Sequence, residues 1–214
     1  MRSPEPASRP AAPRFLGFLA LRGVHFVASR LCGGAVAGLA FDAKFGPTPG
    51  GWTAYREPRE FIDAVARQAR SFGPCSARIL VLGCGTAEFA GGLPPDSFWS
   101  ILGIDLSRRA IAIATEAADP ARARFEVADM RTYRPPGPQD VVTLSESIYY
   151  LGRRDAVALF ARLRAENPGV IFLVTISQAA RYRSYLEDIR DTAPSILEDR
   201  PLVPGKERHL IIFR

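Results

Sequence analysis

The residues best suited to binding a ligand stand in a glycine turn that follows a short apolar run. Gly83 and Gly85 close the sequence RILVLGCG (78–85), and residues 88–93 have the spacing of a short helix. Glycine permits backbone angles and close contact between backbone and ligand that other residues prevent. Open α/β sheets bind ligands at such turns, at the carboxyl end of a central strand. Taken alone, the turn is equally consistent with a tight strand-to-helix connection.

Acidic residues follow the next two predicted strands in the same way. Asp105 ends the strand 99–106, where its carboxylate can accept hydrogen bonds from both hydroxyls of a ribose. Asp129 follows the strand 124–128, where an adenine edge would lie, and it can accept from the exocyclic amine. Ser107 is better placed than Asp105 to cap the following helix. Three features in register after successive strands therefore predict a nucleoside site at one edge of a sheet.

Candidate reactive side chains follow the fourth predicted strand, 140–144. Glu146 is a candidate to bind a substrate ammonium or to act as a general base; the alternative is a carboxylate satisfied by a backbone amide or an arginine. Tyr149 and Tyr150 are candidates to line a pocket and face a cation, or they simply pack the loop. Tyr55 follows a Gly/Pro-rich segment that can close over a site as a lid, or it anchors the N-terminal helix.

The elements that must position these residues alternate between strand and helix. The predicted strands are 78–82, 99–106, 124–128, 140–144 and 170–176, and the predicted helices are 58–72, 88–93, 107–118, 155–166 and 178–190. This alternation predicts an α/β fold with a mostly parallel sheet covered on both faces. A closing antiparallel hairpin is predicted over 195–214, with its turn at Pro204-Gly205.

The N-terminal quarter of the chain has a different composition. Residues 1–13 contain four prolines, which predicts a disordered tail. Residues 15–41 are strongly apolar but carry a polar stripe at helical spacing, so we expect a helix folded against the domain rather than an export signal or an integral membrane span. A surface-lying helix and a homodimer contact are the alternatives. We therefore divide the chain into a tail (1–13), a helical cap or lid (14–72) and a ligand-binding domain (73–214).

Composition restricts the class of partner. The net charge is +6, but only Lys44 and Lys206 are lysine among the 28 basic residues, and the arginines are spread along the chain. Without a clustered basic stripe and interleaved aromatic residues, we predict no nucleic-acid face. The three cysteines do not stand at ligand spacing with one another or with either histidine. They predict reduced thiols in a cytoplasmic protein and no metal site.

Together the motifs resemble those of class I S-adenosylmethionine (SAM)-dependent methyltransferases. VLGCGTAEF (81–89) resembles the glycine motif of that family, GIDLS (103–107) its ribose motif and VADM (127–130) its adenine motif. DVVTLSESIYYL (140–151) resembles the strand that ends beside the methyl donor, and its ESIYYL part is similar to small NodS-like N-methyltransferases. The resemblance covers about residues 55–214.

The resemblance implies a fold, a cofactor and a set of site residues. The family has a Rossmann-like sheet of seven mostly parallel strands with an antiparallel last strand, here with a helical N-terminal cap, and its cofactor is SAM. The activity implied is methylation of an N or O atom of a small-molecule substrate, in specialised metabolism. The implied contacts are Gly83, Cys84 and Gly85 with the methionine part of SAM, Asp105 and Leu106 with the ribose, Asp129 and Met130 with the adenine, and Ser145 near the sulfonium.

The chain departs from the family pattern at two positions. Val81 stands where the family usually carries an acid that helps to hold the α-ammonium of SAM, and Ala87 replaces the third glycine. Tyr55, Arg56 and Ser145 are the candidates to bind the methionine end instead. Loss of the acid also suggests a SAM cyclase of the azetidine-2-carboxylate type, which releases methylthioadenosine. A non-enzymatic partner subunit is a third hypothesis, against which the two intact aspartates argue.

Overall fold

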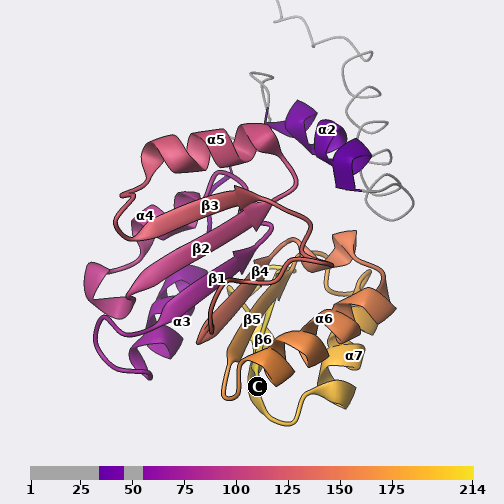
Figure 1. Ribbon diagram of the computed structural model, residues 1–214. Coiled ribbons are helices and arrows are strands. Elements are labelled where there is room, and N and C mark those ends of the chain that lie inside the picture. Colours follow the sequence, from indigo (N-terminus) through magenta and orange to yellow (C-terminus); the bar gives the residue numbers. More distant parts are fainter. Residues whose placement is uncertain (1–33, 46–54) are drawn as a thin grey trace, which may run out of the picture.

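The computed structural model describes residues 34–45 and 55–214 (Figure 1). Its sheet consists of β1 (Arg78–Leu82), β2 (Ser100–Asp105), β3 (Ala123–Val127), β4 (Val141–Ser145), β5 (Ile171–Ile176), β6 (Ile196–Pro201) and β7 (His209–Phe213). The strand order is β3-β2-β1-β4-β5-β7-β6. β1 to β5 pair in parallel, and β7 is antiparallel to both of its neighbours. The predicted seven-stranded, mostly parallel sheet with an antiparallel last strand is confirmed.

Helices cover both faces of this sheet. One face carries α3 (Arg59–Arg70), α4 (Glu88–Gly92) and α5 (Arg108–Ala117), and the other carries α6 (Arg153–Glu166) and α7 (Arg183–Thr192). Every residue of β5 is buried, as expected for a parallel strand between two layers of helices. The chain passes from β1 to one side of the sheet and later from β4 to the other (Figure 1). The carboxyl ends of β1 and β4 therefore border the crevice where open α/β sheets bind ligands.

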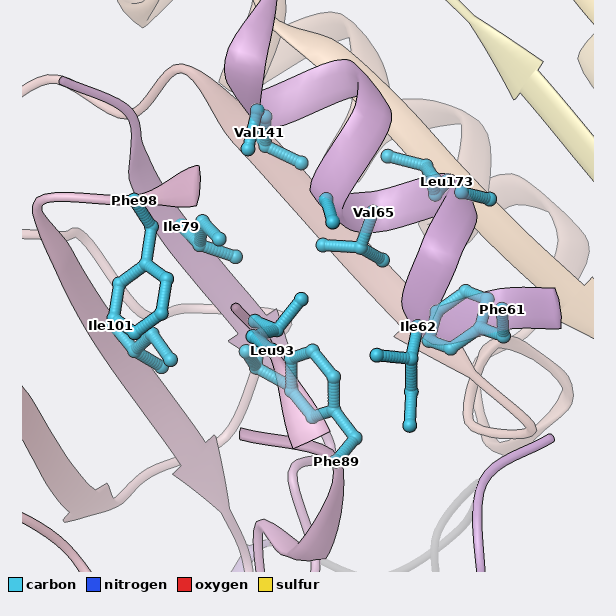
Figure 2. Close-up of a cluster of buried hydrophobic side chains, with 14 of the residues drawn as sticks. Phe61, Ile62, Val65, Ile79, Phe89, Leu93, Phe98, Ile101, Val141 and Leu173 are labelled. Atoms are coloured by element: carbon cyan, nitrogen blue, oxygen red, sulfur yellow. The ribbon is translucent and has the colours of Figure 1, made fainter. Parts of the chain in front are cut away.

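The helix α3 belongs to the core of the sheet. Phe61, Ile62 and Val65 recur at helical spacing and pack over side chains from several strands (Figure 2). Burial of three such side chains stabilises the fold by several kcal/mol, since each contributes about 1.5–3 kcal/mol. The structure thus places α3 with the sheet, whereas the sequence grouped it with the N-terminal cap.

The described part of that cap is α2 (Gly34–Lys44), which lies against the start of α5. A Cβ atom on Gly38 would lie 2.8 Å from the backbone oxygen of Leu106, so only glycine permits this approach. Ser107 caps α5 by accepting a hydrogen bond from the N–H of Ala110, which confirms the predicted cap. Helix α2 is therefore held over the carboxyl edge of the sheet.

The remainder of the N-terminal region lies outside the described residues. This applies to the predicted tail, to most of the predicted apolar helix with its homodimer contact, and to the Gly/Pro-rich segment before Tyr55. Within residues 34–45 and 55–214, no helix has the length and apolar content needed to cross a membrane.

Candidate active site

A cavity of about 750 Å³ lies at the carboxyl ends of the central strands and beside α2. Every site residue predicted from the sequence except Arg56 lines it: Tyr55, Gly83, Cys84, Gly85, Asp105, Leu106, Asp129, Met130, Ser145, Glu146, Tyr149 and Tyr150. They come from segments that lie up to 95 residues apart in sequence, between Tyr55 and Tyr150. The sheet thus brings the separate motifs to one place.

The glycine turn forms the floor of the cavity at the end of β1. Gly83 has φ +75°, and a Cβ atom there would lie 2.6 Å from the Cβ of Ser147. The Ser147 hydroxyl donates to the backbone oxygen of Leu82 at 2.7 Å, which fixes the two loops to each other. Gly85 has φ +54°, and Ala87 adopts a similar left-handed conformation at φ +53° where the family has its third glycine. Ala87 thus takes a backbone conformation that glycine adopts more readily.

Asp105 is held at the end of β2 by the same turn. One carboxylate oxygen accepts the N–H of Gly85 and the other accepts the N–H of Ser107, both at 2.9 Å. Burial raises the pKa of Asp105 above its ordinary value, and these backbone N–H groups oppose the shift. Because a carboxylate offers about four acceptor positions, Asp105 can still accept a hydrogen bond from a ligand.

Asp129 stands at the other end of the cavity, after β3. Its carboxylate accepts hydrogen bonds from the side chain of Arg131, with Nε at 3.0 Å, and from the Arg131 backbone N–H at 3.0 Å. The predicted adenine acceptor is therefore oriented by an adjacent guanidinium. Met130 lies between this pair and the glycine turn, with its Cε within 3.5 Å of a Cβ built on Gly83.

A buried ionic cluster stands at the ends of β4 and β5. Arg208, from the β6–β7 connection, pairs with Glu57 at 2.7 Å and with Glu146 at 2.9 Å. The three side chains are only 11%, 9% and 16% exposed, respectively. Arg208 also donates to the hydroxyls of Ser145 at 2.6 Å and Thr175 at 3.0 Å. Burial lowers the pKa of Arg208, but the two carboxylates more than compensate and keep it charged.

Glu146 is the most constrained carboxylate of the cavity. Its backbone is left-handed, with φ +54°, which is uncommon for a residue other than glycine. One oxygen faces Arg208 Nε and the Thr175 hydroxyl, and the other accepts the Ser177 N–H at 3.0 Å and the Tyr149 hydroxyl at 3.2 Å. Four donors occupy the acceptor positions of a carboxylate. This arrangement suits a fixed negative charge better than a base that must take up a proton.

Aromatic rings form the wall beside Glu146. Tyr149 stacks on Tyr182 with centroids 4.7 Å apart, and Tyr150 meets Phe41 of α2 edge to face at 5.0 Å. Lys44 Nζ lies 3.4 Å from the Tyr150 hydroxyl. Burial, followed by the charge of Glu146, raises the pKa of Tyr149 far above its ordinary value, so its hydroxyl stays protonated at neutral pH. The contacts of Phe41 and Lys44 with Tyr150 therefore connect α2 to the loop that follows β4.

Comparison with known proteins agrees with this geometry. A family model described as a methyltransferase domain matches residues 79–166. The N-methyltransferase NodS from Bradyrhizobium japonicum WM9, solved with S-adenosylhomocysteine (SAH), is similar with a TM-score of 0.63 over 83% of this chain and 97% of that chain, at 18% identity. The chain therefore has the Rossmann-like fold of class I methyltransferases, and residues 79–166 match the methyltransferase domain model. The comparison with curated protein sequences gives no match.

Other solved structures share this methyltransferase fold. The glycopeptide N-methyltransferase MtfA, complexed with SAH, is 17% identical with a TM-score of 0.57, over 74% of this chain and 90% of that chain. The [4+2]-cyclase SpnF is 22% identical with a TM-score of 0.56, over 67% of this chain and 59% of that chain. The fold is therefore shared with proteins of different named activities.

The sequence did not reveal all residues of the candidate site. Glu57 and Arg208 are 151 residues apart, and no spacing or motif joins them. Tyr182 was predicted as part of a helix, with no sign of its stack on Tyr149. Arg56, a predicted partner of the methionine end, pairs instead with Glu88 at 3.6 Å.

Proposed function

We propose that this protein is a SAM-dependent methyltransferase acting on an N or O atom of a small molecule, in specialised metabolism. The observation that carries the proposal is that residues for the methionine, ribose and adenine parts of SAM, named from three separate motifs, line one cavity. The cavity lies at the switch point between β1 and β4. Its volume of about 750 Å³ is within the range of small-molecule sites.

The donors and acceptors of the cavity suit the parts of SAM. The glycine turn presents backbone without side chains, which allows a ligand to lie against it. Asp105 is the proposed acceptor for the ribose hydroxyls, and a charged acceptor of this kind contributes about 1.5–3 kcal/mol. Asp129 is the proposed acceptor for the adenine amine, with Arg131 fixing its orientation.

When bound, SAM supplies a methyl group that a lone pair of the acceptor attacks while the carbon–sulfur bond breaks, and SAH is released. The protein has to align the two molecules and exclude water. The rings of Tyr149 and Tyr150 are the proposed neighbours of the sulfonium, with a cation–π attraction of about 0.5–2 kcal/mol. Since the Tyr149 hydroxyl donates to Glu146, its oxygen can accept the hydrogen of the attacking group and orient the lone pair. Phe41 of α2 packs against the Tyr150 ring.

The names of similar proteins favour nitrogen as the acceptor atom. NodS and MtfA are both described as N-methyltransferases. An oxygen acceptor is the alternative within the same reaction class.

A second candidate is intramolecular cyclisation of SAM. In this reaction the amino nitrogen attacks a carbon of its own chain, the carbon–sulfur bond breaks, methylthioadenosine leaves and a proton passes to solvent. One observation favours it: Val81 lines the cavity where the family has an acid, and an ammonium without that acid loses its proton more readily. The fold itself is compatible with chemistry other than methyl transfer.

Incubation of the purified protein with SAM and a panel of amines and alcohols, followed by mass spectrometry, distinguishes these reactions. We expect an acceptor heavier by one methyl group together with SAH. Methylthioadenosine with a cyclic amino acid would instead support the cyclase. Absence of turnover, and of SAH binding by calorimetry, would contradict both and favour a non-enzymatic subunit. Asp105→Ala serves as the inactive control.

A further inference from the structure

The face of the sheet covered by α3 has no carboxylate on β1 beside the cavity. Val81, at the family's acidic position, is 4% exposed and packs with the α3 side chains. Its partner in the register of β4 is Thr143. Side chains alternate along a strand, so Thr143 and Ser145 point to the same face as Val81. The wall that would face the ammonium of SAM therefore contains two hydroxyls and a valine.

Thr143 carries an unused hydroxyl. The side chain is fully buried, it lines the cavity, and its Oγ1 has no hydrogen-bond partner among the described residues. A buried hydroxyl without a partner destabilises a protein by about 1–3 kcal/mol. Such a group beside a cavity indicates a polar ligand atom at that position.

A carboxylate from another segment lies beside this wall. Glu57, immediately before α3, is 9% exposed at its side chain and lines the same cavity. It pairs with Arg208 and lies in hydrogen-bonding contact with Ser145. Glu57 thus stands over the strand end where the two hydroxyls point.

The charge of this cluster is not balanced. Glu57 and Glu146 together carry two negative charges, and Arg208 supplies one positive charge. Both carboxylates line the cavity, while Arg208 lies behind them and is not part of the cavity wall that the described residues form. Burying an unpaired carboxylate is costly unless a cation completes it. The cluster is therefore suited to a ligand that carries a positive charge.

We propose that Glu57, with the Thr143 hydroxyl, binds the α-ammonium of the methionine part of SAM, in place of the missing acid at position 81. Arg208 is a positioning residue: it holds Glu57 against Ser145 and leaves one carboxylate charge for the ligand. This inference rests on the proposed function, since it names the residues that anchor one end of the same cofactor. It also keeps the ammonium protonated, which favours methyl transfer over cyclisation.

Calorimetry with two ligands tests the proposal. SAH contains the amino-acid end, and methylthioadenosine has the same nucleoside without it. We expect Glu57→Gln to weaken SAH binding by about 10- to 100-fold, the range of a buried charge-assisted hydrogen bond, and to change methylthioadenosine binding less than about twofold. Glu60→Gln, which removes an exposed carboxylate one position into α3, should change neither affinity.

The isosteric variant Thr143→Val provides a second measurement that does not disturb the ion pairs. It should weaken SAH binding about threefold and leave methylthioadenosine binding unchanged. The proposal is overturned if Glu57→Gln leaves SAH affinity within about twofold of the wild type, or if both ligands weaken equally. Wild-type protein that binds neither ligand would contradict the proposed function itself, and this proposal with it.

Discussion

Asp42 Oδ1 accepts the Ser107 hydroxyl at 2.6 Å, which joins α2 to the loop that follows Asp105. The same oxygen accepts the N–H of Arg109 at 3.0 Å, so a residue of the cap satisfies donors at the start of α5. The cap and the proposed ribose site are therefore coupled through two hydrogen bonds.

Asp42→Ala should release α2 from α5. Loss of these bonds costs about 1 kcal/mol, which lowers the melting temperature by about 2–4 °C, and hydrogen exchange in residues 34–45 should become faster. SAH binding should weaken several-fold because the cavity loses its cover. Glu116→Ala, on the exposed side of α5, is the matched control. Unchanged exchange in α2 would show that other contacts hold the cap.

Gly83→Ala should disable the glycine turn. The new methyl group would meet the Ser147 Cβ at 2.6 Å in a backbone conformation of φ +75°. We expect a loss of about 1–3 kcal/mol in the free energy of unfolding and at least a tenfold loss in SAH affinity. Gly137→Ala has no atom within 4 Å of the added Cβ and should behave as wild type. The account is contradicted if the two variants are equally stable and bind SAH equally well.

Thr143 and Thr175 make a matched pair of fully buried threonines on β4 and β5. The Thr175 hydroxyl contacts Arg208 at 3.0 Å and Glu146 at 3.3 Å, whereas that of Thr143 has no partner among the described residues. In the ligand-free protein Thr143→Val should therefore raise the melting temperature by about 2–4 °C and Thr175→Val should lower it. Thermal denaturation of the two variants measures this difference. Destabilisation by both would mean that the Thr143 hydroxyl is satisfied.

The stability contributed by Glu57 should depend on pH. Burial raises its pKa above the ordinary value, against the opposing attraction of Arg208 and the hydrogen bond from Ser145, with repulsion from Glu146 added to the burial effect. A carboxyl whose folded pKa is raised favours folding fully below its unfolded pKa, and this contribution is lost as pH rises through the folded pKa. Glu57→Gln imitates the protonated form permanently.

We therefore expect Glu57→Gln to raise the melting temperature at pH 7 by about 2–4 °C and to have little effect near pH 4, where the wild-type residue is itself protonated. Melting curves between pH 4 and pH 8 measure the difference, and Glu60→Gln provides the exposed control. A variant that is less stable than wild type at pH 7 would show that the attraction of Arg208 exceeds the cost of burial.

The elements that depend on local sequence were predictable. The apolar runs of β1, β4 and β5 predicted buried strands, and Ser107 caps α5 because its hydroxyl needs only the N–H three residues later. The glycine turn was also visible, since Gly83 and Gly85 both adopt positive φ values. The parallel sheet then brought the predicted site residues into one cavity without any further information.

Contacts between distant segments were not predictable. Nothing in the local sequence joins Glu57 to Arg208 or Asp42 to Ser107, because the fold alone brings these segments together. The predicted helix from 178 to 190 begins instead at Arg183. Its first turn is displaced because the Ser177 N–H binds Glu146 and Gln178 takes φ +54°, and both features serve the cavity.

The crystal structure of the protein with bound SAH tests the central claim most directly. The account predicts that the ribose hydroxyls lie within hydrogen-bonding distance of the Asp105 carboxylate, with the adenine beside Met130 and Asp129. A nucleoside found elsewhere, or an Asp105 carboxylate that contacts only the backbone in that complex, would contradict it.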